Sequence, residues 1–272
     1  MANGDTATAL GKAEGELTWW TLLWRTAHNL RKCFHWAWLD TVCQYRRSII
    51  GPLWETINMA VLIAGCTVVS SAIFGGNNLP YIALGIIIWS VILSAVTDGS
   101  ATFIKNSNYI TGTNFSIDLY VGRTVFKTAI NFTHHAILYF IALLFLSVPV
   151  GWISLLAIPG IILLFLNVYW AVVVFAFLSA RFRDIEMILR NAVQLAFFIT
   201  PVFWDYRTIQ SDRKFIVDYN ILFYYVEIIR APLLGEIPPP SHYAAVVIAT
   251  IIGYLLAFIV YRRLRRQLAF FV

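Results

Sequence analysis

The sequence YRRSIIGPLW at residues 45–54 stands where an amphipathic N-terminal region meets the first long apolar run of the chain. That run, LWETINMAVLIAGCTVVSSAIF at 53–74, contains a single charged residue, Glu55. A proline in the first turn of a helix loses no needed hydrogen bond, and about 20 apolar residues cross the hydrocarbon layer of a bilayer. The stretch therefore predicts a membrane-spanning helix that begins just after Gly51-Pro52.

The composition of the whole chain agrees with a membrane protein. Of its 272 residues 60% are hydrophobic and 12% are charged, whereas an average soluble domain has roughly 25% charged residues. These values exclude an ordinary cytosolic enzyme. The formal net charge is +6, but the basic residues lie between apolar runs and form no continuous stripe, which favours membrane topology and excludes nucleic acid as a partner.

Five further apolar runs follow the first one, and the fifth of the six is short for a span. Together they predict an all-α integral membrane protein with one membrane domain, residues 51–272. The expected spans are 53–74, 81–103, 124–148, 155–179, 191–204 and 243–261.

The region before the membrane domain divides into a flexible N-terminus, 1–16, and an amphipathic helix with its linker, 17–50. Apolar side chains recur there at helical spacing, with basic and polar side chains on the opposite face. The apolar series is Trp20, Leu23, Ala27, Leu30, Phe34 and Trp38. Its tryptophans and basic residues predict a helix that lies in the cytoplasmic membrane interface, and the alternative is a helix packed on a soluble core. No cleaved signal peptide is expected.

The distribution of Lys and Arg predicts the orientation. Sixteen of the 20 fall on one side of this topology, in 1–54, 104–127, 181–190 and 262–266. The positive-inside rule therefore places both termini in the cytoplasm. The segment 205–242 is too long and too apolar for a plain loop, so we expect a re-entrant helical hairpin that enters from the extracytoplasmic side and breaks near Pro232. The alternative, a seventh span, would place the basic C-terminus outside.

No catalytic constellation is visible. The chain has no G-x-x-x-x-G-K-[ST], no G-x-S-x-G, no H-E-x-x-H and no acidic pair within a span, so we expect no ATPase site, catalytic residue or metal in this chain. Cys33, Cys43 and Cys66 form no C-x-x-C pair. His134 and His135 lie near the middle of the third span, where neutral histidines hydrogen-bonded between helices are expected; a proton relay or ligand site is the alternative.

Aromatic side chains cluster around the end of the fifth span and in the segment beyond it. Ring faces stack on the apolar faces of sugars without fixing one register, so these side chains are candidates to line a polysaccharide channel. Helix packing is the alternative. The candidates are Phe197, Phe198, Phe203, Trp204, Phe223, Tyr224 and Tyr225.

Three stretches resemble ABC-2 type permeases. YRRSIIGPLW at 45–54 is similar to the family's Y-R-R-[ST]-x-[LI]-G-P-x-W. ARFRDI at 180–185, leading into FFITPVFW at 197–204, is similar to the branch that exports O-antigen polysaccharide or teichoic acid. YNI at 219–221 through RAPLLG at 230–235 is similar to N-P-L … R-x-x-[LI]-[LI]-x-G, with Ile221 in place of the usual proline.

The resemblance implies a homodimer in the bacterial plasma (inner) membrane that binds two copies of a separate nucleotide-binding ATPase, which holds ATP and magnesium. The exported substrate would be a polysaccharide on a polyprenyl diphosphate lipid, O-antigen or teichoic acid. The loop 105–122 would contain the helix that docks on the ATPase. Its candidate contact residues are Asn108, Tyr109, Ile110, Thr111, Asn114 and Phe115.

Arg46 and Arg47 precede the first span at headgroup level, so they are candidates to bind the lipid diphosphate, because guanidinium groups bind phosphate oxygens bidentately. Positive-inside anchoring is the alternative role. Two other functions stay open: a same-fold exporter of drugs or small lipids, and an integral membrane transferase that acts on lipid-linked sugars.

Overall fold

The computed structural model describes residues 28–74, 78–112, 116–145, 151–208 and 214–272, and within these ranges the chain is helical without strands. The longer helices are α3 (Leu30–Gln44), α4 (Leu53–Phe74), α5 (Leu79–Lys105), α7 (Ile117–Phe145), α8 (Ala157–Arg181), α9 (Asp184–Ile199), α11 (Ile221–Leu233) and α12 (Pro240–Leu264). Short elements join or end them: α6 (Ser107–Gly112), η1 (Trp152–Leu156), η2 (Tyr206–Thr208), α10 (Phe215–Asp218), η4 (Arg265–Gln267) and α13 (Leu268–Phe271).

Four helical stretches of the described chain are long and apolar enough to cross a membrane. They are Leu53–Phe74, Leu79–Lys105, Trp152–Arg181 and Pro240–Phe271, which coincide with the first, second, fourth and sixth predicted spans. Helices α7 and α9 fall on the other two. Helix α9 has 16 residues and ends at Ile199, because Pro201 disfavours helical backbone at Thr200.

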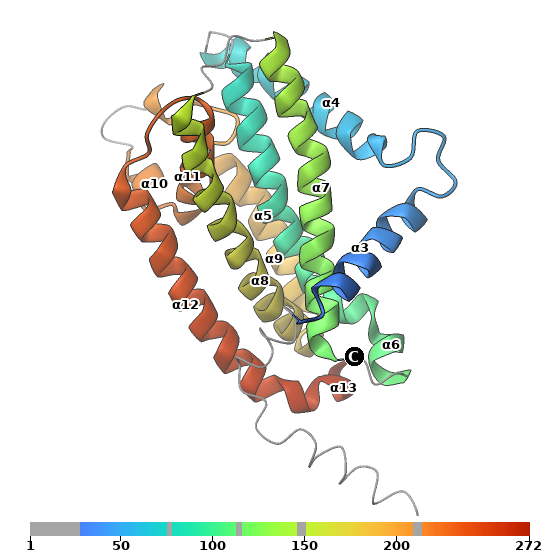
Figure 1. Cartoon of the computed structure of the whole chain (residues 1–272). Coiled ribbons are helices and arrows are strands. Elements are labelled where there is room, and N and C mark those ends of the chain that lie inside the picture. The colour runs from blue at the N-terminus through green and yellow to red at the C-terminus, as the bar shows by residue number, and fades with distance from the viewer. Residues whose placement is uncertain (1–27, 75–77, 113–115, 146–150, 209–213) are drawn as a thin grey trace, which may run out of the picture.

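Helices α5, α7 and α8 run side by side through the centre of the bundle, and α12 lies against α8 and α11 (Figure 1). Helix α5 is buried around its whole circumference from Tyr81 to Trp89, as expected for a helix that is apolar on all sides. Near its other end, Phe103 meets Phe177 of α8 edge to face, with ring centroids 4.9 Å apart. These two helices form the core that positions the other elements.

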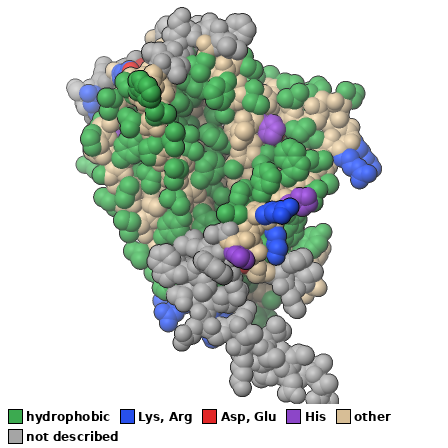
Figure 2. Space-filling view, in the orientation of Figure 1, with side chains coloured by type: hydrophobic (Ala, Val, Ile, Leu, Met, Phe, Trp, Pro, Cys, Tyr) green, Lys and Arg blue, Asp and Glu red, His purple; other side chains and the backbone are tan. Residues whose placement is uncertain are grey.

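Helices α4 and α12 lie at the periphery and expose apolar side chains. Val61 and Val68 of α4 are 67% and 68% exposed. Figure 2 shows apolar side chains over much of the visible face, with Lys and Arg side chains at its edges and in its lower right part. A surface of this kind suits contact with lipid or with another apolar protein surface.

Helix α3 leaves the bundle at an angle (Figure 1) and packs on α7, where Phe34 meets Phe126 and Trp36 meets Tyr120. Its small side chains Cys33, Ala37 and Thr41 are buried. The apolar side chains that the sequence predicted for one face, Leu30, Phe34 and Trp38, are each between 45% and 48% exposed. The part of the predicted helix before residue 28 lies outside the described residues. The described part keeps an outward apolar face, as an interface helix requires.

The segment between α9 and α12 contains α10 and α11, and the predicted break near Pro232 is wrong. Pro232 lies inside the last turn of α11, while the chain breaks at Tyr219-Asn220, between α10 and α11. Proline has no N–H to donate to the carbonyl of Ile228, four residues earlier. The Tyr243 hydroxyl lies 3.2 Å from that carbonyl and 2.8 Å from the Leu156 carbonyl, so its one proton is shared between the two acceptors. Helix α11 extends one residue past the proline, to Leu233.

Candidate substrate groove and coupling surface

Three of the predicted channel residues gather where α9 ends. The rings of Phe197, Phe198 and Phe203 lie with their centroids 5.4 to 6.1 Å apart, and Trp89 of α5 lies 5.7 Å from Phe197. With α4 these three rings border a groove of about 380 Å³. The α4 side of this groove, called the α4–α9 groove below, consists of Val61, Leu62, Gly65, Cys66 and Val69.

The other four predicted channel residues lie apart from that groove or at its edge. The Trp204 indole donates to the Phe198 carbonyl at 3.2 Å. Phe223 and Tyr224 belong to a second aromatic cluster, in which Phe223 contacts Tyr206 and Tyr224 contacts His242. Tyr225 is buried and donates to Asn167 of α8. The structure therefore divides the seven side chains among separate surfaces.

The turn Thr200-Pro201-Val202 connects the aromatic groove to α11. The Asn220 side chain caps α11 by accepting from Leu222 N at 3.0 Å, so the helix begins at Ile221 without the proline typical of the family pattern. The same side chain donates to Thr200 Oγ1 at 2.9 Å. The Asn220 side chain is therefore bonded both to the first turn of α11 and to Thr200. Through it, α11 fixes the position of the turn that follows α9.

A second bond to the same turn comes from Arg230, whose side chain is fully buried in α11. Its Nη1 donates to the Pro201 carbonyl at 2.8 Å, and its Nε and Nη2 both donate to Glu227 Oε2, at 3.0 and 2.6 Å. The guanidinium also lies 3.7 Å from the centroid of the Tyr81 ring of α5. Each hydrogen-bonding nitrogen of this buried cation thus has a partner.

Gly85 of α5 makes this arrangement possible. A Cβ at that position would lie 2.4 Å from the Val202 carbonyl oxygen and 3.3 Å from Arg230 Nη1. The sequence analysis did not single out Glu227 or Gly85, and it named Arg230 only as the first residue of the family pattern at 230–235. A signal was present, because Glu227 and Arg230 are opposite charges three residues apart inside an apolar segment, where charges survive only when paired.

Arg46 and Arg47 lie in the turn that joins α3 to α4, and both side chains are exposed. The Tyr45 hydroxyl donates to Glu55 in the first turn of α4, and the Ser48 hydroxyl accepts from the backbone N–H of Gly51 at 3.2 Å. These contacts fix the turn on both sides of the arginines. The two guanidinium groups therefore project from an ordered turn beside apolar surface.

The predicted coupling loop contains α6, which holds Asn108, Tyr109, Ile110 and Thr111. Tyr109 is 54% exposed, whereas Ile110 packs against the hydrophobic core. Asn114 and Phe115 lie outside the described residues. Helix α7 begins at Ile117 and takes in the end of the predicted loop. Figure 1 shows α6 and α13 at the same end of the bundle.

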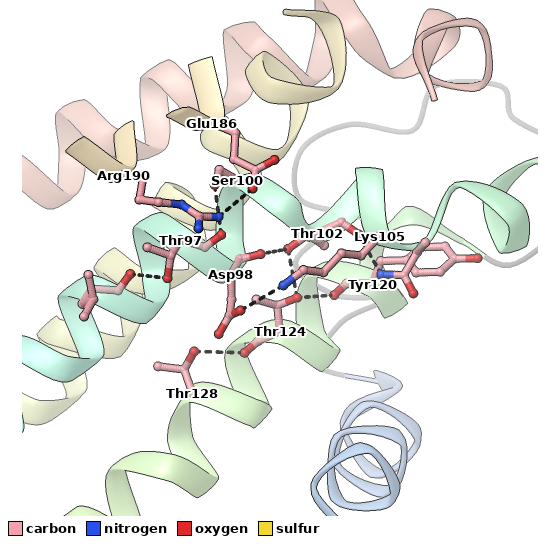
Figure 3. Close-up of polar contacts among 12 residues, drawn as sticks. Thr97, Asp98, Ser100, Thr102, Lys105, Tyr120, Thr124, Thr128, Glu186 and Arg190 are labelled. Carbon is pink, nitrogen blue, oxygen red and sulfur yellow. Dashed lines mark hydrogen bonds and ion pairs between the residues drawn. The ribbon is translucent and has the colours of Figure 1, made fainter. Parts of the chain in front are cut away.

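A row of polar contacts near that end joins α5 with α7 and includes side chains of α9 (Figure 3). Lys105 pairs with Asp98 at 3.4 Å, and Arg190 pairs with Glu186 at 3.0 Å. Between α5 and α7 the hydroxyls of Thr102 and Thr124 lie 3.0 Å apart.

The polar contacts continue deeper in the bundle, where Ser90 Oγ lies 3.1 Å from His135 Nδ1. His134 bonds its own helix through the Ile130 carbonyl, at 2.8 Å. The sequence analysis considered the two histidines but not the helical spacing of polar residues along α5 and α7, which would have indicated two facing polar stripes. In the described part of the chain no three His, Cys, Asp or Glu side chains come together as metal ligands.

The apolar helices, peripheral apolar faces and polar ends define a multi-pass helical membrane protein. The sequence profile of the ABC-2 type transporter family matches residues 31–234, more than half of the chain. The protein belongs to this family. It is similar to two proteins of Klebsiella pneumoniae that are each described as O-antigen export system permease protein RfbA, with 24% identity to each over 191 residues. The similarity covers 67% of this chain and 72% of each relative.

Proposed function

We propose that the chain is the membrane subunit of an exporter that moves a polyprenyl-diphosphate-linked polysaccharide, O-antigen in the first instance, out of the cytoplasm across the bacterial inner membrane. Two copies of the chain would form the path, and two copies of a separate ATPase would bind ATP and magnesium and supply the energy. The chain itself would act as a transport subunit without catalysis. Family membership and the similarity to O-antigen export permeases support this proposal.

The observation that carries the proposal is the aromatic α4–α9 groove. Phe198 is 64% exposed and Leu62 of α4 is 48% exposed, so one chain alone leaves the groove open. A second copy facing it would enclose a path between two sets of rings. Aromatic faces bind sugar rings without fixing a register, which suits a polymer that slides.

The proposed topology has six spans, with α7 and α9 as the third and fifth, and both termini in the cytoplasm. Helix α7 has 29 residues, and at 1.5 Å per residue that length is sufficient. Segment 205–242, with α10 and α11, would be the re-entrant hairpin at the extracytoplasmic end. Non-helical backbone at membrane depth needs protein contacts, and the bonds from Asn220 and Arg230 to the turn after α9 are contacts of this kind.

The lipid diphosphate would enter between α3 and α4 and bind Arg46 and Arg47. ATP binding by the partner would move α6 through the exposed Tyr109 and widen the path. Charged groups at the cytoplasmic end of the proposed route are compatible with this order of events. Lys105 and Arg190 are exposed on the polar row of Figure 3, where the first sugars would pass.

The test is ATP-driven transport of lipid-linked polysaccharide by the chain and its co-purified ATPase in proteoliposomes. We expect polymer to appear on the far side only with ATP. Changing both Arg46 and Arg47 to Ala should reduce transport at least tenfold while the ATPase still co-purifies.

Two control variants separate diphosphate binding from anchoring by charge. The double change to Lys keeps the charge but loses bidentate binding, so it should also transport poorly; wild-type transport would leave only the anchoring role. Changing Arg262 and Arg263, which are also exposed, to Ala removes the same charge elsewhere and should have little effect. ATP-dependent efflux of short amphiphiles without polymer would favour a drug or lipid exporter, and modification of the lipid-linked sugar without ATPase would favour a transferase.

A further inference from the structure

We propose that the cavity between α5, α8, α11 and α12 binds one acyl chain of a bilayer phospholipid. This cavity has a volume of about 360 Å³ and is separate from the α4–α9 groove. Its walls include Ala95 of α5, Trp170 of α8, Tyr225 of α11, and Ala249 and Gly253 of α12. Nothing in the proposed export path uses it.

The cavity lies at mid-depth of the bundle. Ala95, Asn167 and Gly253 line it, and each lies near the middle of its own helix, in α5, α8 and α12 respectively. Helices α5, α8 and α12 each form all or most of a stretch that is long and apolar enough to span a membrane. At this depth the surrounding solvent is hydrocarbon.

The polar side chain in the wall, Asn167, has no capacity left for a ligand. Its Oδ1 accepts from Trp170 Nε1 at 2.7 Å and from the Tyr225 hydroxyl at 2.6 Å. Its Nδ2 donates to the Leu163 carbonyl at 2.8 Å and to Thr250 Oγ1 at 2.7 Å. With these bonds made, the amide offers neither donor nor acceptor. A water molecule or a sugar would lose hydrogen bonds by entering, because a buried water needs two to four polar partners.

The cavity is open toward the periphery through α12. Ile252 and Leu256 line it, and their side chains are 60% and 44% exposed, so they contact whatever surrounds the bundle. For a family of membrane proteins this is lipid. The occupant can therefore come directly from the bilayer.

The volume suits a linear acyl segment. An apolar cavity of roughly 150 Å³ holds one benzene, so this one, at about 360 Å³, suits about twice that number of carbons. An acyl segment of that length fits these limits.

Gly253 and Trp170 form the inner wall. A Cβ on Gly253 would lie between 2.2 and 2.5 Å from atoms of the indole ring, so the ring lies directly on the α12 backbone. The bond from Nε1 to Asn167 fixes its orientation. Trp170 is consequently a built-in fluorescent reporter for a chain in the cavity.

The test uses quenching by lipids brominated in the middle of the acyl chain. The full chain is placed in nanodiscs of brominated or ordinary phosphatidylcholine, and the Trp170 signal is taken as the difference between wild type and Trp170→Phe. We expect brominated lipid to reduce that signal at least twofold. No reduction would overturn the proposal.

Filled-cavity variants distinguish a chain inside the cavity from lipid outside it. Ala249→Phe should restore at least half of the lost Trp170 signal, and Ala95→Leu on the opposite wall serves as a second filling variant should the first misfold. Ile248→Phe, at a neighbouring exposed site outside the cavity lining, should leave quenching unchanged. Equal quenching in the filled variants and wild type would overturn the proposal, and so would loss of quenching on adding a few per cent of polyprenyl phosphate, because the occupant would then be an isoprenoid.

Discussion

At the scale of single residues, the most consequential feature is the buried pair of Glu227 and Arg230. The side chains are 3% and 0% exposed and are bonded to each other, and Arg230 also donates to the Pro201 carbonyl. Replacing a buried ion pair by apolar groups can be neutral, but removing one partner leaves an uncompensated charge. The pair therefore makes α11 and the turn after α9 sensitive to a change at either Glu227 or Arg230.

Glu227→Gln should destabilise the protein by about 3–5 kcal/mol, because Arg230 stays charged and buried. The measurement is the thermal midpoint in detergent, which is followed by the loss of the monodisperse peak on heating. Arg207 and Glu236 form a matched exposed pair, with side chains 48% and 45% exposed. Glu236→Gln should change stability by no more than about 1 kcal/mol. Equal losses of stability in the two variants would show that burial of the Glu227–Arg230 pair contributes nothing to stability.

The two cysteines of α3 should differ in reactivity. Burial, with a smaller contribution from the charge of Asp118, raises the pKa of the Cys33 thiol to about 11, and Cys33 is buried whereas Cys43 is exposed. The thiolate is the reactive form, and below pH 11 its fraction at Cys33 rises about tenfold per pH unit. At pH 7.5 N-ethylmaleimide should label Cys43 at least 100 times faster than Cys33, as read by peptide mass spectrometry. Comparable rates would mean that α3 separates from α7 in solution.

At the scale of elements, the position of α11 depends on the side chain of Asn220, the residue just before the helix. Asn220 performs two tasks, because Oδ1 caps the helix and Nδ2 bonds Thr200. The family pattern, in which Ile221 stands in place of the usual proline, does not indicate that Asn220 bonds Thr200. The link between α9 and α11 therefore depends on a single amide.

Asn220→Ser and Asn220→Ala separate these tasks. Serine retains the cap but is too short to reach Thr200, whereas alanine loses both. Loss of a cap costs about 1 kcal/mol, so alanine should lower stability by about that much more than serine. The readout is the thermal midpoint in detergent. A variant with serine as unstable as alanine would indicate that the bond to Thr200, not the cap, holds α11.

Substitutions in α6 should separate binding of the ATPase from folding of the chain. Tyr109→Ala removes a side chain that is 54% exposed, so we expect an unchanged thermal midpoint but at least fivefold less ATPase retained on purification. Ile110→Ala removes a side chain packed on the core and should lower the midpoint. Normal ATPase retention by Tyr109→Ala would exclude this face of α6 as the docking surface.

At the scale of the whole molecule, α4 and the stretch that contains α12 are the least buried of the four long apolar stretches. Of their apolar windows 17% and 22% are buried, against 67% in α5. In a two-fold dimer, residues on the axis meet their own copies. Because α4 also borders the α4–α9 groove, the proposed dimer would use α4 and cover that groove.

Cross-linking tests this arrangement in membranes. In a background with Cys33, Cys43 and Cys66 changed to Ala, Leu62→Cys should form a covalent dimer with a short bismaleimide. Leu255→Cys on α12, which is 59% exposed, should stay monomeric under the same conditions. Cross-linking of Leu255→Cys alone would place the interface on α12 and leave the α4–α9 groove facing lipid.

Prediction from the sequence worked where local rules are sufficient. Helix α4 spans Leu53–Phe74 as expected, because Gly51-Pro52 and the apolar run define its start and length. It was less accurate where a contact overrides a local preference. Pro232 disfavours a helix, but α11 extends to Leu233. The Ile228 carbonyl, which loses its helical donor at the proline, lies 3.2 Å from the Tyr243 hydroxyl, and that hydroxyl also donates to the Leu156 carbonyl at 2.8 Å. Six spans and the re-entrant hairpin stay predictions.

The sequence by itself determined the class of protein and the approximate bounds of its apolar helices, since both follow from composition, hydrophobic length and the backbone limits of proline. Only the tertiary structure decided which side chains share a surface. Phe197 and Tyr225 are both aromatic, but one borders the α4–α9 groove and the other bonds Asn167 beside the acyl-chain cavity. The reason is physical: helical periodicity fixes the face on which a residue lies, while its neighbour is set by packing between helices far apart in the chain.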